Sequence, residues 1–105
     1  MNTANLQIEG LLMAMTALAK LMREKGAATT DEIDQVLAEA EAITKSDAVR
    51  HGGMRDANVE AVLFPLRFLR IANRRGEPVA AFSEVAAEVG RLTTDASPEV
   101  AAKRN

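Results

Sequence analysis

Residues 25–33, KGAATTDEI, carry the signals that end one helix and begin the next. Gly26 follows a basic helix end and can take the left-handed conformation that closes a helix. Thr29 and Glu32 have the spacing of a capping box, in which a hydroxyl and a carboxylate bind free N–H groups of the new helix. Because so few residues separate the two helices, the sequence predicts an antiparallel helical hairpin.

The helix before this turn, expected over residues 3–25, is apolar on two sides. The first strip has the alternating spacings of three and four that are typical of a core-facing stripe, and it comprises Ile8, Leu11, Met15, Leu18 and Met22. The second strip lies roughly on the opposite side and comprises Leu6, Met13, Ala14, Ala17 and Leu21. A helix that is apolar nearly all round must be covered on both faces.

A chain of 105 residues can be too short to cover such a helix by itself. We therefore expect a homodimer, with an interface formed by the second strip and the outer side of the third helix. The candidate self-association residues are Leu6, Met13, Ala17, Leu21, Phe64 and Phe68.

Two further helices follow the capping box before the chain reaches its last helix. The second helix carries apolar residues on one face, and its pattern breaks over residues 46–55, around Gly52-Gly53. The third helix is expected from Asp56 to about Arg74. Pro65 lies in its middle and predicts a kink there, because proline removes a backbone hydrogen bond and clashes with the preceding turn.

The fourth helix is expected to begin near Pro78, since proline suits the first turn of a helix. Its apolar pattern ends after Thr94. The sequence thus predicts an all-α fold, with a single four-helix domain over residues 1–94 and a frayed or disordered tail over residues 95–105. The composition agrees, because aromatic residues make up only 3% and alanine, leucine, valine and methionine dominate the apolar set.

The inventory of reactive side chains is thin, so no enzyme, cofactor or metal site is expected. The chain has no cysteine, which excludes disulfides, thiolate metal sites and cysteine nucleophiles. His51 is the single histidine, and no nucleophile motif surrounds Ser46 or Ser83. Glu84 and Glu88 are four residues apart, but the Glu-x-x-His pairs of diiron bundles are absent.

The uncharged run from Gly10 to Ala19 ends in small residues, as a signal peptide does. However, Glu9 precedes the run and no basic residue does, against the required basic start. Ten uncharged residues are also far short of the ~20 that span a bilayer. We expect no targeting or membrane segment and a cytoplasmic location.

The net charge of −2 hides a polarised distribution of charges. Residues 26–44 carry five acids and no base, whereas residues 45–75 carry seven bases and three acids. Either the two halves attract each other within the bundle, or the basic half meets an anionic partner such as nucleic acid. The candidate anion-binding residues are Arg50, His51, Gly52, Gly53, Arg55, Arg67, Arg70 and Arg74.

The Gly-Gly loop can present backbone N–H groups to an anion at the start of the third helix. It lacks the spacing and the ending of a Walker loop, and glycines also simply let a chain turn. The leading functional hypothesis is therefore a small non-catalytic protein that acts by self-association and by binding another protein. The alternative is an anion or nucleic-acid binder that uses the basic residues.

Overall fold

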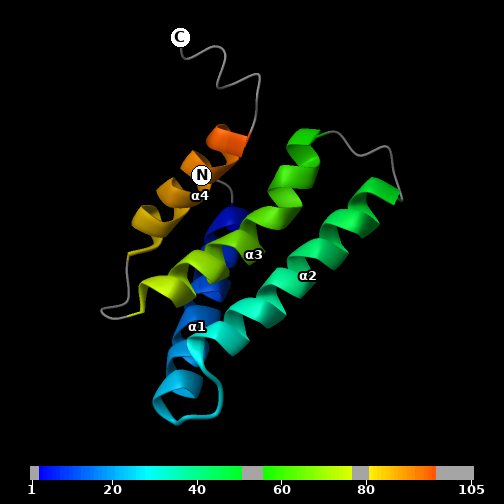
Figure 1. Cartoon of the computed structure of the whole chain (residues 1–105). Coiled ribbons are helices and arrows are strands. Elements are labelled where there is room, and N and C mark those ends of the chain that lie inside the picture. The colour runs from blue at the N-terminus through cyan, green and yellow to red at the C-terminus, as the bar shows by residue number, and fades with distance from the viewer. Residues whose placement is uncertain (1–2, 51–55, 77–80, 97–105) are drawn as a thin grey trace.

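The computed structural model describes residues 3–50, 56–76 and 81–96, and every element within them is a helix (Figure 1). The helices are α1 (Thr3–Glu24), α2 (Thr30–Arg50), α3 (Asp56–Arg75) and α4 (Phe82–Ala96). The predicted all-α fold of four helices is confirmed. The predicted start of the fourth helix near Pro78 is wrong, because α4 begins at Phe82 and Ala81 before it caps the helix by accepting from Glu84 and Val85 N–H. The Gly-Gly loop, Pro78 itself and most of the tail fall outside the described residues.

Helix α3 is the centre of the bundle and packs against each of the other three helices, most extensively against α2. Its buried face carries Phe68, which has no exposed surface and stacks on Phe82 of α4 with ring centroids 4.9 Å apart. Val85 and Val89 bring the predicted apolar face of α4 into the same core, as expected from their spacing.

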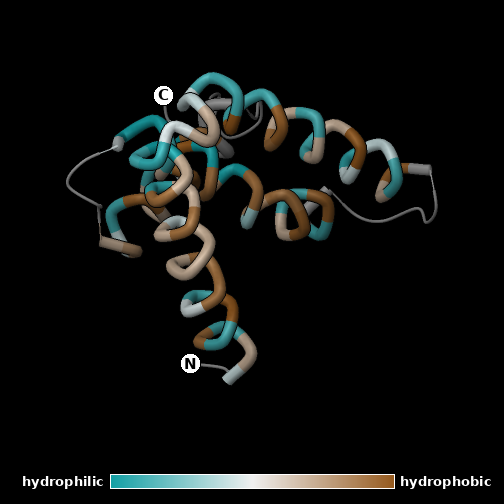
Figure 2. The backbone as a smooth tube through the Cα atoms, turned by 90° about the horizontal axis from the view of Figure 1, so that it is seen from below, coloured by the Kyte–Doolittle hydropathy of each residue, from teal (hydrophilic) through white to brown (hydrophobic). Residues whose placement is uncertain are grey.

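Helix α1 contributes little to this core. Leu12 packs into it, and Thr16 is buried one turn further on, where its hydroxyl donates a hydrogen bond to the Leu12 carbonyl at 2.8 Å. The first strip was expected to face the core, and this prediction is wrong: Leu11 is 62% exposed and the rest of the strip is about half exposed. Part of the reason is that the N-terminal half of α1 projects away from the other helices (Figure 2).

The turn between α1 and α2 forms as the sequence predicts. Gly26 has a φ of 70°, and Ala27 N–H donates to the Met22 carbonyl at 2.9 Å, closing the C-terminal cap. Thr29 Oγ1 accepts from Glu32 N–H at 3.0 Å, and Glu32 Oε1 accepts from Thr29 N–H at 2.8 Å. Both halves of the capping box are therefore present.

Helix α2 is longer than its sequence pattern indicates. The break expected from residue 46 does not occur, and the helix continues to Arg50. Ala48 explains the extension, because it is buried against Val59 and Leu63 of α3 in a second small core. Helix α3 passes through Pro65 without interruption, and the kink at that residue stays a prediction.

Candidate functional site

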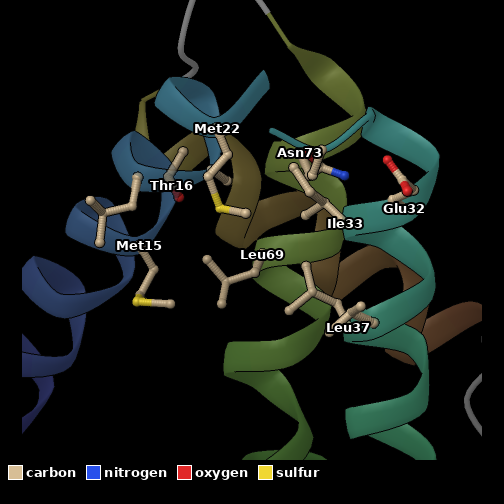
Figure 3. Close-up of a pocket in the computed structure, with 12 residues that line it drawn as sticks. Met15, Thr16, Met22, Glu32, Ile33, Leu37, Leu69 and Asn73 are labelled. Atoms are coloured by element: carbon tan, nitrogen blue, oxygen red, sulfur yellow. The ribbon is translucent and has the colours of Figure 1, made fainter. Parts of the chain in front are cut away.

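A groove lies between α1 and α2 on the described surface. It has a cavity volume of about 430 Å³, and α3 forms its floor (Figure 3). The apolar side chains that line it are Met15, Leu18, Ala19 and Met22 of α1, Ala28 of the turn, Ile33, Val36 and Leu37 of α2, and Leu69 of α3. The groove exists because α1 and α2 each pack on α3 more than on one another.

Asn73 of α3 ties the three walls of the groove together at one end. Its side chain is buried, with 2% of its surface exposed. Arg23 Nη1 donates a hydrogen bond to Asn73 Oδ1 at 2.6 Å, and Asn73 Nδ2 donates to the Thr30 carbonyl at 3.0 Å. One amide therefore joins the end of α1 and the start of α2 to α3.

Sequence reasoning missed Asn73, although a signal was present. It follows Leu66 and Leu69 at spacings of three and four, so it occupies the register of an apolar stripe. A polar residue in such a register is buried only with hydrogen-bond partners. That position marks it as a bridging residue.

The polar side chains that line the groove are engaged within the chain. Thr16 donates to the Leu12 carbonyl, and Glu32 accepts from the Thr29 N–H in the capping box. Asn73 has the two partners described above. The surface that the groove presents is therefore mainly apolar.

The candidate self-association residues separate into two groups in the structure. Leu6, Ala17 and Leu21 lie on the exposed side of α1. Met13 and Phe64 are half-buried and pack against the core. Phe68 has no exposed surface at all, so its place is in the core and not on a dimer interface.

The basic residues of α3 face the acids of α2. Arg70 Nε donates to Asp34 Oδ1 at 3.0 Å, and Arg70 Nη1 donates to Glu41 Oε1 at 3.1 Å. Arg67 Nε donates to Glu41 Oε2 at 3.1 Å, and Arg67 also contacts Glu60. Glu41 thus bridges both arginines, and the two charged halves of the sequence meet inside one chain.

These contacts shift the protonation equilibria of the groups involved. The hydrogen bonds from Arg70 lower the pKa of the Asp34 carboxyl below its ordinary value, and they raise the pKa of Arg70. For Arg67, burial opposes the charged form, but the hydrogen bonds with Glu41 and Glu60 outweigh it and raise the pKa of the guanidinium. All three groups favour their charged forms in the folded chain.

Of the other predicted anion-binding residues, Arg74 lines a second pocket of about 290 Å³ together with Arg67, Arg70 and Glu41. Arg74 is exposed, and Arg75 pairs with Glu88 at 2.7 Å and with Glu84 at 3.5 Å. The side chain of Arg50 and all of His51, Gly52, Gly53 and Arg55 lie outside the described part of the chain.

The Asp34–Arg70 pair predicts a pH dependence of stability. Because the carboxyl pKa is lower in the folded state, the pair contributes stability above about pH 4 and loses it as the pH falls through the folded-state pKa. We expect Asp34→Asn to lower the free energy of unfolding by less than about 1 kcal/mol at pH 6. We expect the difference in free energy of unfolding between Asp34→Asn and the wild type to narrow at pH 3. Urea unfolding at the two pH values measures this difference.

Glu39→Gln is the control for this experiment, because it removes the same charge from an exposed position of the same helix. If the difference in free energy of unfolding from the wild type narrows equally for both variants, the pH effect comes from net charge and not from the Asp34–Arg70 pair.

The described residues also allow two general observations. Within them, no three histidine, cysteine, aspartate or glutamate side chains gather closely enough to hold a metal ion. None of the described helices combines the length and the apolar character needed to cross a lipid bilayer.

Comparisons with models of known protein families, with curated proteins and with solved structures give no significant match.

Proposed function

We propose that the protein is a non-catalytic interaction module that self-associates through the apolar surface of α1. The observation that carries the proposal is the exposure of this helix. Seven large apolar side chains of α1 are between 43% and 62% exposed, and they are Leu6, Ile8, Leu11, Met15, Leu18, Leu21 and Met22. Contiguous apolar surface of this kind marks an interaction site in a folded protein.

The energetic reason is the hydrophobic effect. Full burial of a leucine, isoleucine or methionine side chain is worth about 1.5–3 kcal/mol, so covering the exposed half of one is worth about 1 kcal/mol. Several such side chains on one helix can outweigh the entropy lost on association. An interface of this composition has few charges to screen, because Glu9 is the one ionisable side chain between Thr3 and Ala19.

Light scattering over a dilution series at low and at high salt tests the proposal. We expect the mass of a dimer that persists at both ionic strengths, because apolar contact does not weaken when charges are screened. A soluble monomer at every concentration would overturn the proposal. A dimer that dissociates in high salt would move the interface to the charged surfaces.

Anion or nucleic-acid binding is the weaker functional candidate. Arg67 and Arg70 already have carboxylate partners on α2, so a phosphate would have to displace Glu41 from both. Arg74 remains as an exposed base on this part of α3. No geometric observation favours this function over self-association.

A further inference from the structure

We infer that the groove between α1 and α2 is filled by α1 of a second copy, reciprocally in both chains. The inference rests on the proposed self-association and specifies its geometry: two α1 helices cross antiparallel, and each lies between α1 and α2 of the other chain. Two features of the same chain support this inference: the apolar helix α1 projects from the bundle, and an apolar groove lies beside it.

The chemistry of the groove selects the type of occupant. A small-molecule pocket ordinarily presents a few unpaired polar groups that orient the ligand. Here the buried Thr16 and Asn73 side chains are hydrogen-bonded within the chain, and the exposed Glu32 accepts from the Thr29 N–H through one carboxylate oxygen. An α-helix needs no such groups, because its backbone hydrogen bonds are satisfied internally. An apolar helix therefore fits this groove better than a polar ligand.

Helix α1 has the properties of that occupant. Its N-terminal half projects from the bundle, and Ile8 and Leu11 on it are exposed (Figure 2). The opposite wall of the groove continues along α2 as an exposed apolar stripe through Val36 and Ile43, which are 64% and 69% exposed. One contact between two copies covers both surfaces.

The size of the helix is sufficient for a stable dimer. Its 22 residues span roughly 33 Å at a diameter of about 10 Å. Half the circumference of such a cylinder offers on the order of 500 Å². The apolar side of α2 adds to this, towards the ~800 Å² per partner of a standard interface.

Twofold symmetry makes the arrangement self-consistent. In an isologous interface, each residue of one copy that contacts a residue of the other is contacted in return. An antiparallel crossing centred near Met15 places Leu11 of one copy beside Leu18 and Val36 of the second copy. Both of these residues line the groove.

Disulfide mapping tests this geometry, because the natural chain contains no cysteine. One chain carries Leu11→Cys and a second, distinguishable by a tag, carries Val36→Cys. The two are refolded together from urea and then oxidised with copper phenanthroline. Both positions are more than 60% exposed in the single chain, so both variants are expected to fold. We expect a covalent heterodimer, because disulfides form between Cα atoms within about 7 Å.

The matched control replaces Val36→Cys by Val49→Cys, which lies on the same helix and is 63% exposed. Thirteen residues of helix separate the two positions, or roughly 20 Å. We expect the Leu11–Val49 mixture to give at most a tenth of the covalent heterodimer. Equal yields from both mixtures would overturn the reciprocal geometry.

Light scattering on the same samples separates the two proposals. A dimer that forms no Leu11–Val36 disulfide would overturn the filled groove while leaving self-association intact, whereas a monomer would overturn both. The fluorescent probe anilinonaphthalene sulfonate gives an independent readout. We expect it to bind weakly to the dimer, and stoichiometric binding to a dimer would show that the groove is open to a small apolar molecule instead.

Discussion

Replacing Leu11 and Leu18 by glutamine is expected to convert the proposed dimer into a folded monomer. The two substitutions place four polar side chains in each dimer interface. At about 1 kcal/mol for each half-exposed leucine, association should weaken by about 4 kcal/mol, or roughly a thousandfold. Because both side chains are exposed in the single chain, the helix content of the monomer should not change. Light scattering and circular dichroism measure the two effects.

Leu92→Gln is the matched control, since Leu92 is a leucine of α4 that is 46% exposed. We expect this variant to dimerise as the wild type does. If it dissociates to the same degree, general surface polarity sets the oligomeric state and α1 has no special part in it. If the α1 double variant unfolds, both leucines support the fold of the single chain.

Replacing Asn73 by alanine is expected to lower the free energy of unfolding by about 3 kcal/mol. The substitution leaves the Arg23 guanidinium and the Thr30 carbonyl without their buried partner. Both groups are part-buried, so the loss is that of two hydrogen bonds, about 1 kcal/mol for the carbonyl and about 1.5–3 kcal/mol for the charged guanidinium. Urea unfolding in the Leu11→Gln, Leu18→Gln background measures the effect, because a monomer removes the contribution of dimerisation to apparent stability.

Asn58→Ala provides the comparison, because Asn58 is an exposed asparagine on the same helix. A surface substitution of this kind changes stability by less than about 0.5 kcal/mol. An Asn73→Ala variant that is no less stable than Asn58→Ala would contradict the bridging role. The two ends of the groove would then be held by the turn and by apolar packing alone.

The sequence predicts local features of this chain well. Gly26, Thr29 and Glu32 form their caps through hydrogen bonds that span at most five residues, so nearby residue types determine them. Four helices can be predicted for the same reason. The hairpin geometry of α1 and α2 stays a prediction, since it depends on how each helix packs against α3.

Features that depend on contacts between residues far apart in the sequence could not be predicted from local sequence patterns. The first strip of α1 has a regular core-facing spacing, yet Leu12 and Thr16 between its members are the buried residues. The regular spacing shows that the strip needs covering but does not identify what covers it. Likewise, α2 extends through Ala48 because this residue packs against Val59 and Leu63 of α3.

The groove was not predicted from the sequence, which placed the first strip of α1 in the core. Met15, Leu18 and Met22 were recognised as one apolar strip, and they form one wall of the groove. The opposing wall depends on the angle between two helices, which no single stretch of sequence specifies. The pairing of the basic residues with the acids of α2 was one of two open interpretations, and the contacts of Arg67 and Arg70 show that it occurs.

The ion pairs between α2 and α3 have a consequence for alignment. Helix α2 is rich in alanine, and a surface of small side chains gives two helices little to resist sliding past each other. Sliding by one turn moves a helix by about 5.4 Å, which would separate Asp34 from Arg70 and Glu41 from Arg67. Ion pairs that stay in contact with water contribute little stability, and these side chains are still 18–26% exposed, but the network permits one alignment. It thereby determines that Ile33, Val36 and Leu37, rather than their neighbours a turn away, line the groove.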